Sequence, residues 1–445
     1  MKHSKIFRKS ALALACAGTL VGAVQTVQAA NWLKLQGTEP PNAAHRAKVW
    51  GFIQPEYQTT GDTLLKAGPW KGQKAIFNQT RPERETNSGF NVIRARLGVR
   101  GQNFPLDGKV NYFFLVEAGN NGITRNGGGS VKITDASVTL NHIKGARVRI
   151  GQFKVPGSEE GLQAIHVFDY INFSNPVDQL LLERFLDSDG SVAAAGANRP
   201  NGPVGAFRDI GIQVFDWFNV GAWEHTYAVM FGNGNGIARG DNNDDKDLYL
   251  YWSSEHVHGG RGPRRHGTKI FGWYQKGTRT IAAGAAQAQT NFDRKRYGMG
   301  ITYRSPKIRA GFEYIKAEGM IFGGTDGAAL PGALNNAGTA VASFNMLPTE
   351  EADGWYVDVG YYITPKWTLD LRYDQLNRGT VVAANERKFT TFTIGSQYFF
   401  NKKSRVLVNY EIRKAEAPNL PSAAPPNVIL DSMDNRLALQ FLAIF

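Results

Sequence analysis

Hydrophobic and polar residues alternate along this chain from Val49 onward, in segments of about ten to thirteen residues. Successive side chains of a β-strand point to opposite faces, so alternation with a period of two predicts strands with one apolar and one polar face. The segment 93–100 shows the pattern clearly. Its apolar residues share one face and its arginines the other: Ile93, Ala95, Leu97 and Val99 against Arg94, Arg96 and Arg100.

The same signature recurs along the rest of the chain. Clear segments lie at 93–100, 110–116, 147–150, 210–214, 227–231, 297–303, 308–314, 355–361, 367–373, 406–412 and 437–445, and weaker ones near 49–59, 131–141, 247–256, 268–276 and 388–400. We count about 16 strands. An even number suits an antiparallel up-and-down β-barrel of a bacterial outer membrane, and the alternation also fits a soluble sandwich.

The lengths of the connections separate these two folds. Short links near 104–108, 142–146, 219–222, 305–306, 364–365 and 401–404 alternate with long ones at 60–88, 119–130, 155–207, 232–245, 277–292, 319–351, 377–387 and 417–432. This alternation is typical of a transmembrane barrel with short periplasmic turns and long extracellular loops. The connection 256–267 is the exception, because it is long and basic where a short turn is expected; either its flanking strands are misplaced or this turn is unusual.

The N-terminus predicts export. Residues 1–29 have a basic start, an apolar stretch over 11–24 and a small-residue site ending at Ala29, as in a cleaved signal peptide; the alternative is a membrane anchor. Cleavage removes Cys16, the only cysteine, and lowers the formal net charge from +13 to +9, since four of 51 Lys and Arg are lost. We therefore expect a short N-terminal segment at 30–48 and an outer-membrane barrel at 49–445.

The polar face of the strands is rich in arginine. By alternation, about fifteen basic and nine acidic residues face the interior of the barrel, which favours anions in a water-filled channel. Guanidinium groups suit oxyanions such as phosphate, because they offer several N–H donors in one plane. The candidate pore-lining, anion-binding residues are Arg94, Arg96, Arg100, Arg147, Arg149, Arg294, Arg296 and Arg309. The alternative is that these arginines pair with carboxylates on neighbouring strands and confer no selectivity.

The long loop 155–207 is a candidate constriction. It contains an apolar stretch over 165–173 that is unusual for a fully solvated loop, and this predicts packing against the inner wall or against a partner subunit. The alternative is an extracellular flap.

Three segments carry a resemblance to a known family: 149–160 (RIGQFKVPGSEE), 182–184 (LER) and 230–236 (MFGNGNG). They resemble the phosphate-selective porins O and P of Gram-negative outer membranes. The resemblance implies a sixteen-stranded homotrimeric channel in outer-membrane lipid, a basic pore with a narrowed middle and passage of small anions such as phosphate. It adds Lys154 to the candidate anion-binding residues. A different hypothesis is a structural barrel, a sleeve that houses or docks an electron-transfer or surface partner.

Other motifs are weak. His256, His258 and His266 lack a defined set of metal ligands, and the acidic stretch 241–247 lacks the spacing of an EF-hand. Ser, His and Asp are present without a spacing that predicts a triad. We expect no enzyme activity, catalytic residue, metal or cofactor, and no nucleic-acid partner.

Overall fold

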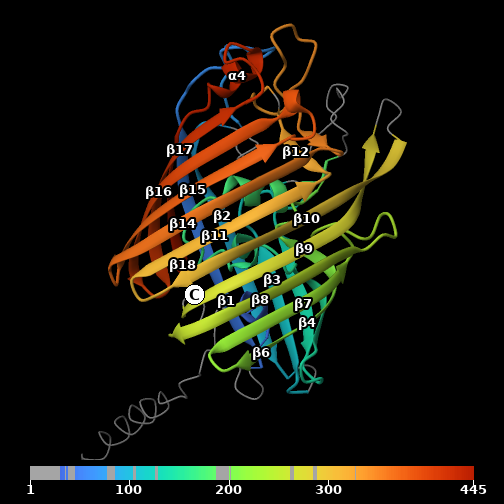
Figure 1. Cartoon of the computed structure of the whole chain (residues 1–445), viewed down its shortest axis with the longest axis vertical. Helices are drawn as coiled ribbons and strands as arrows, with labels where there is room; N and C mark the ends of the chain where they lie inside the picture. The colour runs from blue at the N-terminus through green and yellow to red at the C-terminus, as the bar shows by residue number, and fades with distance from the viewer. Residues whose placement is uncertain are drawn as a thin grey trace, which may run out of the picture.

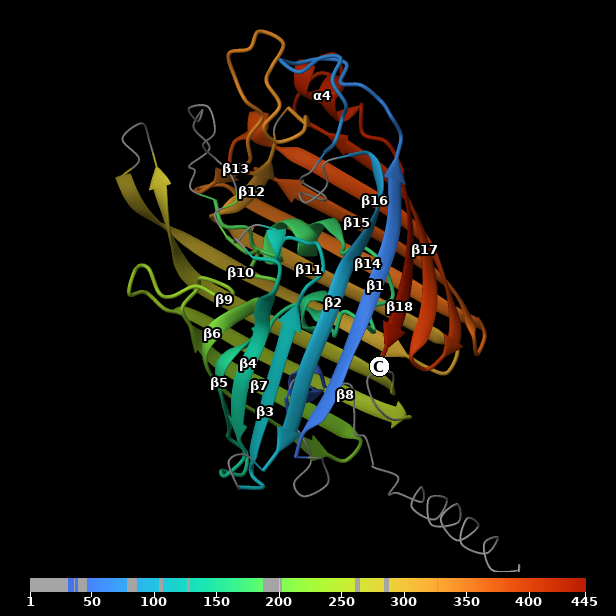
Figure 2. The same ribbon diagram turned by 180° about the vertical axis from the view of Figure 1, so that it is seen from behind.

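The computed structural model describes residues 31–35, 37–38, 46–77, 86–103, 107–125, 129–186, 200, 202–260, 265–283, 288–325 and 327–445. Sixteen antiparallel strands form one closed barrel, shown from two opposite sides in Figures 1 and 2. Neighbours in the barrel are neighbours in the chain, and the first and last strands pair to close it, from Phe52 opposite Ile444 to Thr60 opposite Arg436. The predicted signal peptide lies outside the described residues.

The barrel strands are β1 (Lys48–Thr60), β2 (Ser88–Gln102), β3 (Val110–Glu117), β4 (Lys132–Leu140), β5 (Arg147–Lys154), β6 (Arg208–Val220), β7 (Trp223–Gly232), β8 (Asp247–Gly259), β9 (His266–Ala283), β10 (Ala288–Arg304), β11 (Ile308–Glu318), β14 (Glu351–Thr364), β15 (Trp367–Arg378), β16 (Arg387–Asn401), β17 (Ser404–Glu416) and β18 (Arg436–Ile444). A separate small sheet contains β12 (Ile321–Gly324) and β13 (Asn345–Leu347). The helices are short: α2 (Trp32–Leu35), α3 (Glu159–Leu162), the π-helix η2 (Val177–Leu181), the 3-10 helix η4 (Ala383–Asn385) and α4 (Pro425–Leu430). Among the described residues, no helix has the length and apolar character needed to cross a membrane.

Burial follows the alternation of the sequence. In β15 the odd positions Leu369 and Leu371 are exposed on the outside, whereas Asp370 and Arg372 are buried inside. The same order holds in β17 and β18. An apolar exterior around a polar interior is the reverse of a soluble protein and is the arrangement that lipid requires. The predicted transmembrane barrel is confirmed.

Two local predictions were wrong, and one open alternative is decided. A β-bulge opposite the Gln54–Pro55 step turns Ile93 into the interior, where it is 3% exposed, so it does not share the outer face of Leu97. Most of the expected loop 277–292 is strand, because β9 and β10 pair from Gly277 onward to Ala283. For the exceptional connection 256–267, the alternative that its flanking strands were misplaced is confirmed, because β8 continues to Gly259 and β9 begins at His266.

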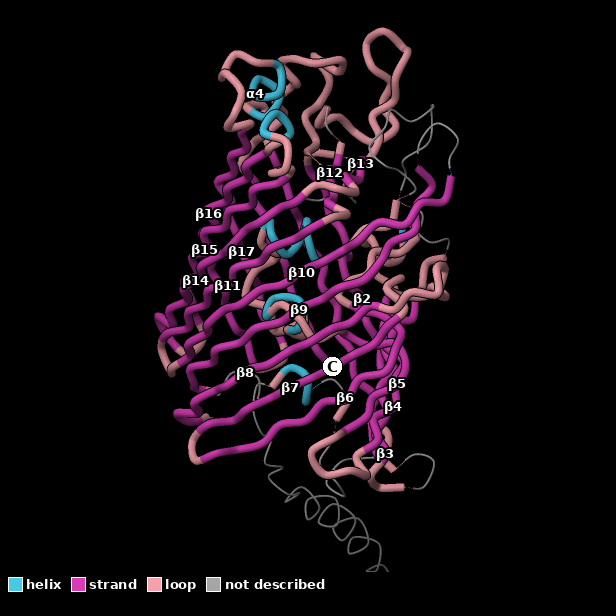
Figure 3. The backbone as a smooth tube through the Cα atoms, turned by 45° about the vertical axis from the view of Figure 1, so that its right-hand side comes forward, coloured by secondary structure: helices cyan, strands magenta, loops and turns pink. Residues whose placement is uncertain are grey.

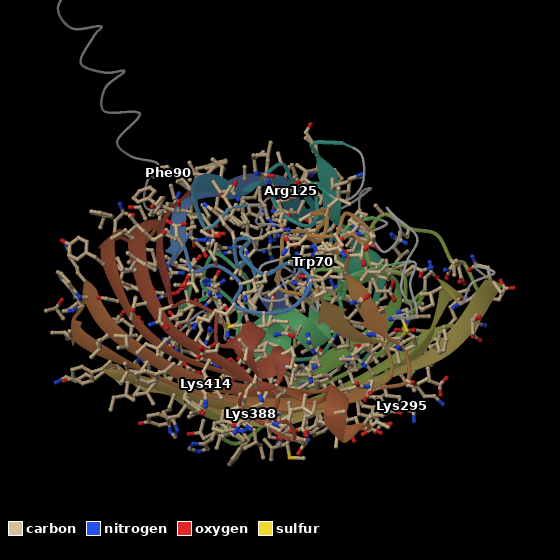
Figure 4. All side chains as sticks on the ribbon, turned by 90° about the horizontal axis from the view of Figure 1, so that it is seen from above. Trp70, Phe90, Arg125, Lys295, Lys388 and Lys414 are labelled. Carbon is tan, nitrogen blue, oxygen red and sulfur yellow. The ribbon has the colours of Figure 1, made fainter. Side chains whose placement is uncertain are left out.

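The interior of the barrel is occupied by the chain itself. Residues 155–186 of the predicted loop, which include α3 and η2, and the N-terminal helix α2 lie inside the ring of strands (Figure 3). At the end of the barrel with the long loops, Trp70 donates to the carbonyl oxygen of Ala333 (3.0 Å), and it lies over the interior when the barrel is viewed along its axis (Figure 4). These segments decide which wall residues meet water.

Candidate functional site

Loop 155–207 crosses the interior and is anchored on the opposite wall. It leaves β5, and its groups hydrogen-bond to residues of β15 and β17. Tyr170 Oη donates to Leu371 O (2.8 Å), and Ile171 N donates to Asn409 Oδ1 (2.8 Å). Asn175 Nδ2 donates to Asp374 Oδ1 (2.7 Å). The loop therefore divides the interior into separate spaces along different parts of the wall.

Two adjoining water-accessible spaces, of about 90 and 170 Å³, lie between the loop and the wall formed by β1 to β6. Three basic residues line both spaces: Arg96, Lys154 and Arg208. Arg94 lines the first space and Arg100 the second. We call these five residues the basic passage. Its acidic lining residues are fewer: Glu56, Asp135 and Asp178.

Arg96, Arg208 and Lys154 of the basic passage have partners of different charge. Arg96 Nε donates to Glu117 Oε2 (2.7 Å), and Arg208 pairs with Asp135 (3.0 Å). Lys154 differs, because its ammonium group donates to the carbonyl oxygens of Gly161 (2.7 Å) and Gln163 (2.5 Å) where helix α3 ends. A carbonyl dipole holds an ammonium in place without cancelling its charge.

The neutral state of His166 reflects the positive field of this region. The ring lies on loop 155–207 with its centroid 5.1 Å from that of Phe52 and 5.6 Å from that of Trp50. Burial, assisted by the nearby cations Arg405 and Arg96, lowers the pKa of His166 to about 3. His166 therefore adds no positive charge to the basic passage at neutral pH.

Two of the predicted residues, Arg147 and Arg149, lie at the end of the barrel with the short turns. Arg147 pairs with Asp216 (3.1 Å) and lies over the ring of Trp217 (4.3 Å). Arg149 is fully buried and donates to Leu33 O (3.1 Å) in the N-terminal segment. The structure does not bring these two arginines into the basic passage.

Arg294 and Arg296 lie in a third space, of about 250 Å³, toward the long loops. Arg294 pairs with Glu183 of loop 155–207 (3.3 Å), and Arg296 donates to the carbonyl oxygen of Met320 (2.7 Å). Burial opposes ionisation of Glu183, but the charges of Arg279 and Arg294 outweigh it and lower the pKa of this carboxyl to about 2.

Arg309 lies on the opposite wall and is surrounded by carboxylates. It forms ion pairs with Asp169 of the loop (3.2 Å), Asp370 (2.8 Å) and Asp358. Such a group adds no positive field to the pore. The alternative that the sequence left open, arginines paired with neighbouring carboxylates, therefore describes this wall.

Sequence reasoning missed Arg208. The predicted loop ended at residue 207 and the predicted strand began at 210, so Arg208 belonged to neither polar face. In the structure β6 begins at Arg208, opposite Lys154 at the end of β5. The signal available in the sequence was the positive charge of Arg208, which lies just before the alternating pattern of the predicted strand.

Comparison with known proteins settles the family. The family model described as Gram-negative porin matches residues 57–416. The chain belongs to the Gram-negative porin family. It is an outer-membrane diffusion channel, with its short turns toward the periplasm and its long loops outside.

Solved structures show the same fold at low sequence identity. A loop-deletion mutant of OmpT from Vibrio cholerae is 10% identical, with a TM-score of 0.51, over 91% of this chain and 100% of that chain. The anion-selective porin from Comamonas acidovorans is 12% identical, with a TM-score of 0.50, over 90% and 100% of the chains. OmpF from Salmonella typhi is 12% identical, with a TM-score of 0.52, over 90% and 97%. No curated protein sequence matches the chain.

Proposed function

We propose that this porin is an anion-preferring channel that admits small oxyanions such as phosphate. The observation that supports the proposal is the basic passage, where five cationic side chains line two adjoining spaces with three acidic ones. Charges on one side of a narrow, low-dielectric passage act on a passing ion more strongly than the same charges in bulk water. Oxyanions suit such a passage, because their oxygen atoms can accept hydrogen bonds from several guanidinium N–H groups at once.

In this proposal loop 155–207 is the constriction. It narrows the barrel by binding the wall opposite its origin, and it brings Lys154 and Arg208 close to the permeating ion. A sixteen-stranded barrel without such a filling would leave a wide aqueous channel with little selectivity. The sleeve hypothesis has less support, because the chain's own segments occupy the space that a partner would need.

The experiment is a reversal-potential measurement in a planar lipid bilayer across a gradient of potassium chloride, repeated with potassium phosphate. In both salts we expect a reversal potential whose sign indicates that anions permeate more readily than cations. We also expect added phosphate to reduce the chloride current by competing with chloride in the basic passage. A reversal potential of the opposite sign would refute the proposal and leave the porin family assignment intact.

We also propose a homotrimer. Three consecutive barrel strands, β3, β4 and β5, are short, with 8, 9 and 8 residues, whereas β9 and β10 have 18 and 17. A tilted strand needs about 9 to 11 residues to span the hydrocarbon layer of the membrane. The side of the barrel formed by β3, β4 and β5 therefore gains most from contact with a second subunit. Native electrophoresis before and after heating tests this, and a mass of one subunit in both lanes would contradict it.

A further inference from the structure

The N-terminal segment lies inside the barrel, near its periplasmic end. Helix α2 is the dark blue ribbon low in the interior in Figure 2. Asn31 Nδ2 donates to Thr226 Oγ1 on β7 (2.5 Å), and Trp32 Nε1 donates to Glu159 Oε1 on loop 155–207 (2.8 Å). Leu33 is 1% exposed. The segment is thus docked on the wall and on the loop at once.

Arg149 holds the segment without an ion pair. Its Nη2 donates to Leu33 O (3.1 Å) and to Thr38 Oγ1 (3.3 Å), and its guanidinium lies over the ring of Phe215 (4.4 Å). Its Nη1 is buried with no hydrogen-bond partner. Within the described part of the chain, no carboxylate forms a salt bridge with Arg149. Two neutral oxygens of the segment therefore occupy positions that suit the oxygens of an anion.

The attachment at Arg149 leaves a buried charge without an ion-pair partner in contact. A buried cation that meets only neutral oxygens has lost its hydration without regaining a full counter-charge. Departure of the segment returns the Arg149 guanidinium to water and restores that hydration. The burial of Trp32 and Leu33 in the main apolar cluster opposes this gain, and the balance between the two decides how readily the segment leaves.

The position of Trp32 shows how departure of the N-terminal segment would change the channel. This side chain lines the space beside Arg100 in the basic passage, and it also lines a separate space on the other side of the barrel, beside Glu255 and Lys269. The segment therefore stands between two water-accessible spaces at the periplasmic end. Its removal would join them into one wider opening.

We propose that the N-terminal segment, residues 31–35 and 37–38, forms a removable plug that partly closes the periplasmic end of the channel. The docked plug covers Arg149 and keeps the two spaces apart, and the undocked plug widens the opening and exposes the Arg149 charge to the lumen. This inference concerns the size of the conducting state. It is independent of the proposed anion preference, which the sign of the reversal potential tests.

A reversible cross-link tests the plug. In the double variant Asn31→Cys/Thr226→Cys, oxidation ties the segment to β7, and the only native cysteine, Cys16, lies in the predicted signal peptide. We expect single channels of the oxidised protein to stay at a low conductance, and we expect dithiothreitol to restore openings to a higher level. The higher level should be roughly 1.5-fold to 3-fold larger, since conductance grows with the open cross-section.

A second arm does not depend on disulfide formation. The variant Trp32→Ala/Leu33→Ala keeps the chain length but removes the apolar contacts of the plug, so it should spend most of its time at the higher conductance. The control pair is Thr280→Cys/Asn291→Cys, whose native side chains are 2.7 Å apart on β9 and β10 away from the plug; dithiothreitol should not change its current. An increase of conductance when the first variant is reduced, or a predominantly higher conductance of the second variant, supports the plug. If the oxidised first variant and the second variant both conduct as the wild type does, the inference is wrong.

Discussion

Replacing Arg94 and Arg100 with glutamine should reduce the anion preference of the channel. Both side chains are half-buried on β2, and each lines one of the two spaces of the basic passage. Glutamine keeps a polar side chain of similar length and removes the charge. Lumen positions tolerate polar substitution, so the barrel should fold normally.

The size of the effect follows from Coulomb's law. One arginine lowers the energy of a monovalent anion about 6 Å away by ~0.7 kcal/mol in water, and raises that of a cation equally. Salt with a Debye length of about 8 Å halves this to ~0.3 kcal/mol. The anion-to-cation ratio then changes by ~0.6 kcal/mol for each arginine, since the two energies move in opposite directions. With 1.36 kcal/mol per factor of ten, this is roughly threefold for one arginine and up to roughly tenfold for both.

The assay is the reversal potential in a salt gradient, with Lys388→Gln/Lys414→Gln as the matched control. These lysines carry the same total charge on the outer face of β16 and β17 and have partners in Glu416. The control should change the permeability ratio little, because the barrel wall separates its charges from the pore. An unchanged ratio in the Arg94/Arg100 variant, or an equal change in the control, would refute the reasoning from the basic passage.

Two further predictions concern stability. Arg309→Gln should lower the free energy of unfolding by about 3–5 kcal/mol in denaturant titrations, because it removes the cation shared by three buried carboxylates, Asp169, Asp358 and Asp370, of which Asp169 keeps its contacts with Arg304 and Arg405. A loss below about 1 kcal/mol would contradict the ion-pair geometry. Burial raises the pKa of the Glu160 carboxyl to about 7, above its usual 4.5, so the folded state binds this proton more tightly than the unfolded state. This contribution to stability is complete below pH 4.5 and is lost as the pH rises through about 7; the unfolding temperature in detergent should fall over that range, and Glu160→Gln should flatten the fall.

The barrel was predictable because lipid constrains every second residue. In β18, Leu437 and Leu439 had to be apolar on the outside whatever the rest of the chain did, so alternation alone placed this strand. The bulge that turns Ile93 inward was not predictable, because one extra residue in a strand leaves the local composition unchanged. Strand ends such as Ala283 were missed for a related reason, since a hairpin that extends beyond the membrane no longer needs an apolar face.

The candidate site was only partly predictable. Alternation identified Arg94, Arg96 and Arg100 as interior residues, and the structure places them on the basic passage. It could not distinguish them from Arg149 or Arg309, which also face inward. Their partners, Leu33 and Asp169, come from the N-terminal segment and from loop 155–207, more than 100 residues away in each case, and no local pattern encodes such contacts.

The loop that crosses the interior also has a mechanical consequence. A hollow cylinder of strands resists flattening only through the stiffness of its wall, and lateral pressure in a bilayer pushes on that wall from all sides. The bonds from Ile171 to Asn409 and from Asn175 to Asp374 tie the segment that leaves β5 to the far wall, so they act as a cross-brace. Deforming the barrel away from a circular cross-section would require these hydrogen bonds to break. The same brace fixes the spacing between opposite walls, so changes in membrane tension should leave the width of the basic passage constant.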